Sequence, residues 1–71
     1  MSKNSKYANE KGLSQREIEI LTLVSEGHTN LEIAERLEIH RNSVQSHLRD
    51  SFKKIGVPNR LQAILWVAKN L

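Results

Sequence analysis

Residues 29–55, TNLEIAERLEIHRNSVQSHLRDSFKKI, contain the signals of two helices separated by a short turn. Thr29 and Glu32 have the spacing of a capping box, which marks the start of a helix, and apolar residues follow at helical intervals as far as Leu37. Residues 38–40 interrupt this pattern without a proline. A second helix is predicted over residues 41–55, with an apolar face made of Val44, Leu48, Phe52 and Ile55. The stretch therefore predicts two helices that meet at a corner.

Similar signals on either side of this stretch predict two further helices. Ser14 and Glu17 form another capping box, and Gly27 can end the helix that they begin. Gly56 can end the long helix, and Asn59 can cap the next one. Alternation with a period of two is nowhere long enough to predict a strand. We therefore expect an all-α domain of four helices, near residues 15–26, 30–37, 41–55 and 59–70.

The corner between the two central helices has the features of a helix-turn-helix. Helices that cross closely need a small side chain at the contact, and Ala34 is suitably placed for it. Ile39 is expected to fill the turn. Glu38 is unusual, because such corners often have glycine there and a left-handed conformation costs another residue about 1 kcal/mol. A corner alone is weak evidence of function, since many small helical proteins contain one.

The length and composition of the chain set limits on the domain. Its 71 residues allow one small domain, which we place at residues 13–71, behind a flexible N-terminal tail or linker of residues 1–12. Cysteine is absent, so no disulfide or thiolate metal site can reinforce the fold. No apolar run is long enough to span a bilayer, and the polar N-terminus does not resemble a signal peptide. We therefore expect a cytoplasmic protein with no membrane contact.

The net charge of +3 is small, but the charges are unevenly distributed. Over residues 13–38 six glutamates outnumber two arginines. Over residues 39–71 six lysines and arginines stand against a single aspartate. A polyanion would therefore bind the C-terminal half of the chain.

The side of the predicted 41–55 helix opposite its apolar face has a composition suited to nucleic acid. A polar stripe runs along it at spacings of 4, 3 and 4 residues, made of Asn42, Ser46, Arg49 and Lys53, with Gln45 beside them. The stripe contains no carboxylate, whereas a merely solvated face usually mixes Glu with Lys. Its amide, hydroxyl, guanidinium and ammonium groups are those that hydrogen-bond to base edges and phosphates. We therefore favour nucleic-acid binding over an ordinary solvated surface.

Further segments at fixed spacing extend this evidence beyond the corner. They are LSQRE (13–17), GHTNLEIAERL (27–37), NSVQSHL (42–48), KKIGVPNR (53–60) and Ala63. On these residues the chain, from Leu13 to Leu71, resembles the LuxR/GerE-type helix-turn-helix family, the DNA-binding module of quorum-sensing receptors and NarL-type response regulators. The resemblance implies a four-helix fold whose second and third helices form the corner.

The resemblance also implies roles for individual residues of the 41–55 helix. Positions that contact bases in the family correspond here to Gln45, Ser46 and Arg49. Positions near phosphates correspond to Arg41, Asn42, Ser43 and Lys53. The chain departs from the family at Leu31 and Gln45, where lysine is frequent, and His40 with Arg41 replaces a frequent Ser/Thr-Glu. Fewer lysines predict a weaker nonspecific attraction to DNA.

The predicted 59–70 helix is apolar over more of its circumference than one small domain can bury. Its core-facing stripe consists of Ile64, Val67 and Leu71, with Ala63 at the edge. A second apolar arc consists of Leu61, Leu65 and Ala68. Because this helix commonly forms the dimer in the family, we expect the second arc to be a homodimer interface. The alternative is that Leu61 and Leu65 cover the 15–26 helix within one chain.

Other polar residues raise the possibilities of metal binding and catalysis, but their spacing supports neither. His28, His40 and His47 lack cysteine partners and metal-ligand spacing, so we expect no metal, no cofactor and no small-molecule ligand in this domain. Serines lie near His47, but no acid completes a triad, so we expect no catalytic residue and no enzyme. Glu17 is expected to act in its capping box alone, and the alternative is an ion pair with Arg60.

Together these observations predict a bacterial transcription regulator that binds double-stranded DNA sequence-specifically, as a homodimer on an inverted repeat. RNA polymerase is a further candidate partner. Two other functions use similar corners: a protein-interaction module that does not bind DNA, and the promoter-binding domain of a sigma factor. The basic stripe favours DNA binding over the first, and NSVQSHL (42–48) with IGVPNR (55–60) fits the LuxR/GerE pattern better than the second.

Overall fold

The computed structural model describes residues 11–71, in which the chain forms four helices. They are α2, Gln15–Ser25; α3, Asn30–Leu37; α4, Arg41–Ile55; and α5, Arg60–Asn70. Within residues 11–71 there is no strand. The predicted all-α, four-helix fold is confirmed, and every helix end lies within one residue of its prediction. Most of the predicted N-terminal tail, residues 1–10, lies outside the described residues.

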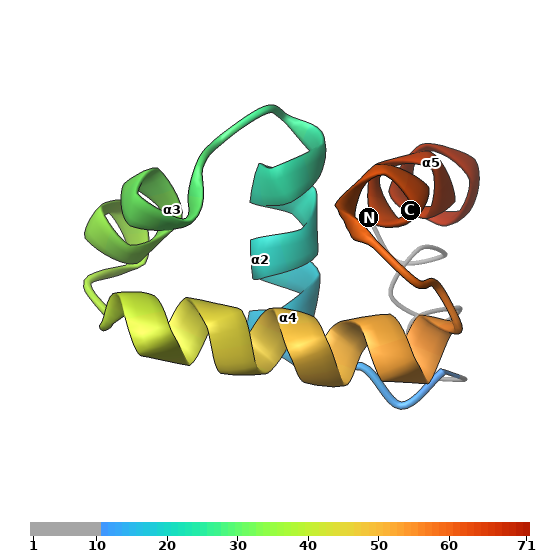
Figure 1. Ribbon diagram of the computed structural model, residues 1–71, viewed down its shortest axis with the longest axis horizontal. Coiled ribbons are helices and arrows are strands. Elements are labelled where there is room, and N and C mark those ends of the chain that lie inside the picture. Colours follow the sequence, from blue (N-terminus) through green and yellow to red (C-terminus); the bar gives the residue numbers. More distant parts are fainter. Residues whose placement is uncertain (1–10) are drawn as a thin grey trace.

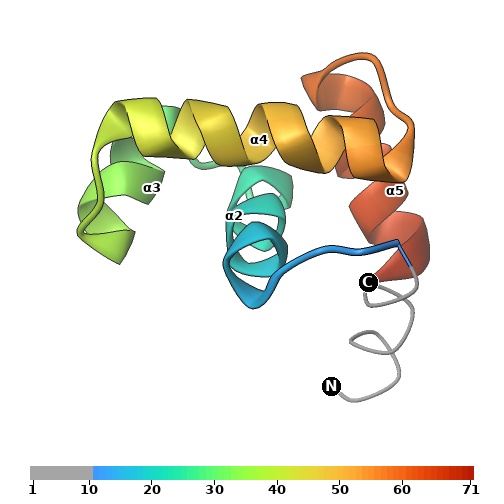
Figure 2. The same ribbon diagram turned by 90° about the horizontal axis from the view of Figure 1, so that it is seen from below.

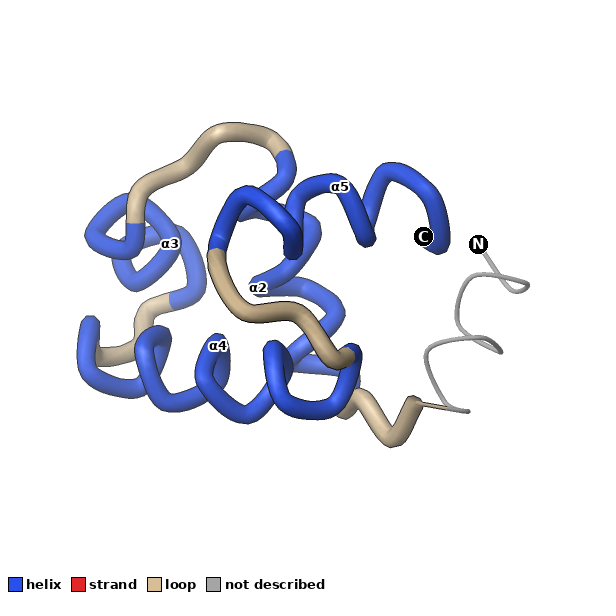
Figure 3. The backbone as a smooth tube through the Cα atoms, turned by 45° about the vertical axis from the view of Figure 1, so that its right-hand side comes forward, coloured by secondary structure: helices blue, strands red, loops and turns tan. Residues whose placement is uncertain are grey.

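α2 is the central helix of the domain, because each of the other helices packs against it. In Figure 1, α2 stands between α3 and α5, while α4 runs along the lower edge of the molecule. Figure 2, seen from below, shows α4 lying across this face of the domain. Short loops connect successive helices, as the tan segments of Figure 3 show. Within residues 11–71, this arrangement leaves the outward side of α4 uncovered by any other helix.

The core lies where α2 meets the other three helices. Its fully buried apolar side chains come from all four helices and are Ile20, Leu21, Val24, Ile33, Val44 and Ala63. Ser51 of α4 is also fully buried, and its hydroxyl donates to the carbonyl oxygen of His47 at 2.6 Å. The prediction that Ala63 lies at the edge of the inward stripe of α5 is wrong. Ala63 lies at the centre of that contact, since a small side chain lets two helices approach closely.

The predicted helix caps are present. The Ser14 N–H donates to Glu17 Oε1 at 2.8 Å, and the Glu17 N–H donates to Ser14 Oγ at 3.1 Å. Thr29 and Glu32 make the same pair of bonds, at 2.9 and 3.1 Å, at the start of α3. Asn59 caps α5 through its side-chain oxygen. These caps satisfy N–H groups that have no partner within their own helix.

The turn between α3 and α4 forms the predicted corner. Glu38 adopts the left-handed conformation, with φ 58° and ψ 44°, at the position where such corners often have glycine. The N–H of Ile39 then donates to the carbonyl oxygen of Ala34 at 3.0 Å, which closes the end of α3. His40 takes the place of the usual Ser or Thr at the start of α4, because its Nδ1 accepts a hydrogen bond from the Asn42 N–H at 3.0 Å.

The ion pair made by Glu17 differs from the one considered from the sequence. Its carboxylate is nearly buried and accepts a hydrogen bond from Lys54 Nζ at 2.8 Å. Arg60 instead donates to Asn30 Oδ1 at 2.8 Å and to the carbonyl oxygen of His28 at 2.7 Å. The expectation that Glu17 acts in capping alone and the alternative that pairs it with Arg60 are therefore both wrong. Arg60 begins α5 beside the connection between α2 and α3, whereas Lys54 reaches the first turn of α2.

Candidate nucleic-acid interface

The outward side of α4 presents the polar stripe that the sequence predicts. Val44, Leu48 and Ile55 are buried on the inner side of this helix, so residues on the opposite side project away from the core. The residues predicted to contact bases are all exposed, and they are Gln45, Ser46 and Arg49. They lie within little more than one helical turn and therefore form one patch.

The residues predicted to contact phosphates lie at both ends of that patch. Arg41 and Asn42 are exposed in the first turn of α4, and Ser43 beside them is half-buried. Lys53 is exposed in the last turn. Phosphate-binding groups at both ends of a helix can fix its position in a groove while the groups between them contact bases.

Arg49 is exposed and makes one weak contact with a neighbouring residue of α4. Its guanidinium donates to the Ser46 hydroxyl at 3.4 Å, which is long for a hydrogen bond and therefore weak. A guanidinium has five N–H donors, and this contact occupies one of them. The planar fork of an arginine can donate two parallel hydrogen bonds to O6 and N7 of guanine. Arg49 is exposed on a helix whose opposite side is anchored in the core, so its reach is well defined.

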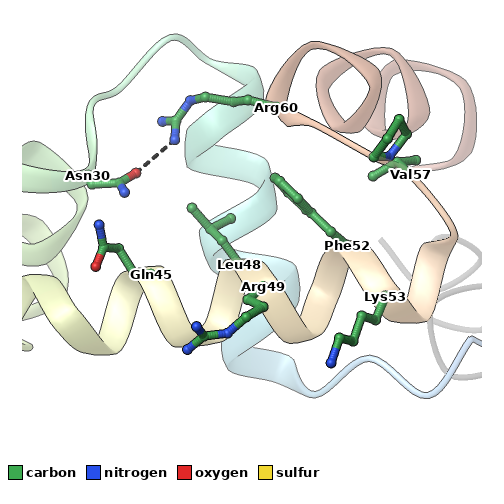
Figure 4. A pocket seen from close by; sticks show the side chains of 9 residues that line it. Asn30, Gln45, Leu48, Arg49, Phe52, Lys53, Val57 and Arg60 are labelled. Carbon is green, nitrogen blue, oxygen red and sulfur yellow. Dashed lines mark hydrogen bonds between the residues drawn. The ribbon is translucent and has the colours of Figure 1, made fainter.

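The two adjacent lysines at the end of α4 have different surroundings. Lys54 donates a hydrogen bond to Glu17, so the positive charge of Lys54 is paired with a carboxylate of the same domain. Burial by itself raises the pKa of the Glu17 carboxyl group, but hydrogen bonds from Lys54 and the Ser14 N–H, with the Lys54 charge, outweigh burial and lower that pKa. Lys53 is exposed beside Arg49 on the outward side of α4 (Figure 4). Lys53 is therefore placed to attract an anionic ligand.

A groove of about 610 Å³ runs beside the stripe, between α4, the start of α3 and the α4–α5 turn (Figure 4). The stripe contributes Gln45, Arg49 and Lys53 to its lining. Two further lining residues, Asn30 and Arg60, were not assigned to the site from the sequence. They are thirty residues apart and lie on different helices. No sequence spacing brings them together, and the charge of Arg60 is the only signal that could have directed attention to it.

The outward side of α5 is apolar. Leu61 and Leu65 are 63% and 53% exposed, and Ala68 is also exposed. Ala63 and Val67 are buried on the other side of the same helix. The alternative in which Leu61 and Leu65 cover α2 within one chain is therefore wrong. Two large apolar side chains lie open to solvent on a helix that is already packed on its inner side.

Two features are absent from residues 11–71, a cluster of metal ligands and a membrane-spanning helix. Nowhere in this range do three His, Cys, Asp or Glu side chains lie close enough together to hold a metal ion. None of the four helices is long and apolar enough to cross a membrane.

Comparison with known proteins gives a consistent result. A family model described as bacterial regulatory proteins, luxR family, matches residues 11–67. The probable csgAB operon transcriptional regulatory protein of Salmonella typhimurium is 49% identical over 59 residues, which cover 83% of this chain and 27% of that protein. The transcriptional regulatory protein LiaR of Bacillus subtilis is 40% identical over 60 residues, which cover 84% of this chain and 28% of LiaR. The chain thus spans about a quarter of the length of these relatives.

The matched region includes the whole corner and the whole of α4. Because the match covers most of the chain and agrees with the fold, the chain belongs to the LuxR family of bacterial regulatory proteins.

Proposed function

We propose that this domain binds double-stranded DNA sequence-specifically, with α4 inserted into the major groove. The observation that carries this proposal is the exposed stripe of Asn42, Gln45, Ser46, Arg49 and Lys53 on α4, which combines donors of several kinds without a carboxylate. Asp50, the single carboxylate of the helix, is exposed and lies about 40° beyond Ser46 around the axis, at the border of this stripe. The major groove admits a helix, and none of the other three described helices covers this side of α4 (Figure 2).

The proposal divides the polar residues of α4 into two groups. Gln45, Ser46 and Arg49 contact base edges, where a glutamine pairs well with adenine and an arginine with guanine. Arg41, Asn42, Ser43 and Lys53 contact phosphates and set the position of the helix along the groove. The first group gives discrimination between sequences, and the second gives affinity for any duplex.

We further propose that two copies of the domain pair on DNA through Leu61, Leu65 and Ala68 of α5. The exposure of these apolar side chains supports the assignment. A twofold axis through this helix would place two α4 helices in successive major grooves, about 34 Å apart, over inverted half-sites. The interface would be small, so pairing is expected to be weak in free solution and effective when both copies bind one duplex.

The biological role that we propose is control of transcription from a promoter region. The curated relatives are named as transcriptional regulators, and one of them as a regulator of the csgAB operon. RNA polymerase is accordingly the protein partner that we propose for a DNA-bound pair of these domains.

Selection from a pool of randomised duplexes tests the main proposal. The domain should enrich a defined sequence, bind it more tightly than a scrambled duplex, and lose affinity for both as salt concentration rises. A domain that only binds other proteins would enrich no sequence and would bind neither duplex. That result would contradict the proposal.

A further inference from the structure

The groove beside α4 has a composition that suits a particular ligand. Its floor is apolar and consists of Leu48, Phe52, Val57 and Pro58. Three cationic side chains, Arg49, Lys53 and Arg60, line it, and no carboxylate does. A ligand with an anionic group and an adjoining apolar surface would complement both the cationic side chains and the apolar floor. A phosphodiester with its deoxyribose is a ligand of this kind.

Arg60 determines the orientation of the Asn30 side chain. A guanidinium only donates hydrogen bonds, so the Asn30 atom that faces it at 2.8 Å must be the carbonyl oxygen. Arg60 also donates to the carbonyl oxygen of His28 at 2.7 Å, which holds the guanidinium against the α2–α3 connection. The amide nitrogen of Asn30 therefore points away from Arg60, toward Gln45 and the groove (Figure 4). Asn30 thus offers its N–H donors to a ligand in the groove.

We infer that Asn30 is a further DNA-contacting residue, which donates to a backbone phosphate of the strand beside α4, and that Arg60 is the residue that positions it. The inference rests on the proposed insertion of α4 into the major groove. With Gln45 and Arg49 at the bases, the groove that they share with Asn30 lies where the bordering strand would run. The ligand is the DNA backbone and not free phosphate, because free phosphate would leave the apolar floor uncovered.

The substitution Asn30→Asp tests this inference with little disturbance of the fold. Aspartate has the same shape, its carboxylate still accepts from Arg60, and a negative charge in the first turn of α3 is favourable to the helix. The change replaces two donors by an oxygen that repels phosphate. Affinity for the selected duplex and for a scrambled duplex should both fall about tenfold, the size expected for a lost hydrogen bond to a charged group.

Gln62→Glu is the matched control. It makes the same change of amide to carboxylate at an exposed position in the first turn of α5, and Gln62 does not line the groove. Both variants lose the same amount of net positive charge. Comparison of the two therefore separates a local contact from a general loss of attraction to DNA.

A phosphate scan identifies the contact itself. In the selected duplex each phosphate is replaced in turn by a neutral methylphosphonate. One replacement should weaken binding of the parent domain and restore binding of the Asn30→Asp variant, because it removes the repulsion. A merely structural role of Asn30 would give no such position-specific rescue.

The outcomes distinguish the inference from the proposed function. If Asn30→Asp binds as well as Gln62→Glu, or if no methylphosphonate rescues it, the inference is overturned while the proposed function stands. If the parent domain binds no duplex, both are overturned. Titration with inorganic phosphate should leave the NMR signals of the Asn30 side chain unchanged, and saturable binding there would overturn the assignment to the DNA backbone.

Discussion

The outward sides of α4 and α5 are both exposed, yet they differ completely in chemistry. α4 presents amide, hydroxyl and cationic groups, whereas α5 presents Leu61 and Leu65. An ordinary solvated helix mixes charges of both signs, as α2 does where Arg16 pairs with Glu19 at 3.3 Å. Neither the polar stripe of α4 nor the apolar arc of Leu61, Leu65 and Ala68 on α5 follows that pattern. The difference indicates two kinds of partner, a polyanion for α4 and an apolar surface for α5.

The same contrast occurs within α4 between neighbouring cations. Lys54 is neutralised by Glu17 and ties the end of α4 to the start of α2. Lys53 and Arg49 lie on the exposed side, in a groove lined by no carboxylate. A basic residue in this sequence is therefore informative about ligands only when its partner in the fold is known.

The largest expected effect concerns α5. Leu65→Glu should abolish cooperative occupancy of a duplex with two inverted half-sites, because pairing would bring two carboxylates into an apolar interface. Binding to a single half-site and the circular dichroism spectrum should stay as in the parent, since Leu65 is 53% exposed. Gel-shift titrations on one-site and two-site duplexes measure both quantities. Cooperativity equal to that of the parent would place the dimer interface elsewhere.

The next effect concerns sequence discrimination by α4. Arg49→Ala should weaken binding to the selected duplex by about 1–3 kcal/mol and bring it closer to the affinity for a scrambled duplex. The reason is the loss of a bidentate contact that only one base pair satisfies. Fluorescence anisotropy with the two duplexes gives the ratio. An equal loss on both duplexes would show that Arg49 contacts only phosphate.

A smaller effect concerns the internal ion pair. In Glu17→Gln the capping bonds to Ser14 can persist, but the charge opposite Lys54 is lost, and the free energy of unfolding should fall by about 1 kcal/mol at neutral pH. DNA affinity at a temperature where both proteins are folded should change little. Urea titrations and anisotropy measure the two effects, and loss of DNA affinity without loss of stability would contradict the assignment of Lys54 to the fold.

The acid dependence of stability tests the same pair. The pKa of Glu17 is lowered on folding from its ordinary value of 4.5, so the ionised carboxylate stabilises the folded state. This contribution is complete above the unfolded pKa and is lost as pH falls through the lower, folded pKa. The stability difference between the parent and Glu17→Gln should therefore vanish at acidic pH. A difference that persists at acidic pH would exclude the charge as its source.

The smallest effects concern single phosphate contacts. Lys53→Gln and Arg41→Gln should each weaken binding to every duplex and lower the slope of log affinity against log salt by about one unit. Lys69→Gln, with the same loss of charge at an exposed position near the end of α5, should leave the slope unchanged. Slopes that match the Lys69→Gln control would place Lys53 and Arg41 away from the DNA.

The helices and their ends could be predicted because their signals are local. Ser14 with Glu17 and Thr29 with Glu32 are three residues apart, and each pair forms the capping bonds expected from that spacing. The exposed stripe of α4 could be predicted for the same reason, since a helical period places its residues opposite Val44. The left-handed turn at Glu38 was anticipated from the corner pattern alone.

Contacts between helices could not be predicted in this way. A helical period shows which residues share a face, but it does not show which end of another helix lies opposite that face. The sequence therefore suggests Arg60 as an ion-pair partner of Glu17, whereas the partner in the structure is Lys54. No sequence pattern indicates the hydrogen bond from Arg60 to Asn30. The central place of Ala63 was missed because its apolar surface is small, although its small size is what allows close approach of α5.

The most direct test of the central claim is an NMR measurement of intermolecular contacts in the complex of the domain with its selected duplex. We expect nuclear Overhauser effects between major-groove base protons and the side chains of Gln45, Ser46 and Arg49, and none to Leu61 or Leu65. Contacts from base protons to α5, with none to the outward side of α4, would contradict it.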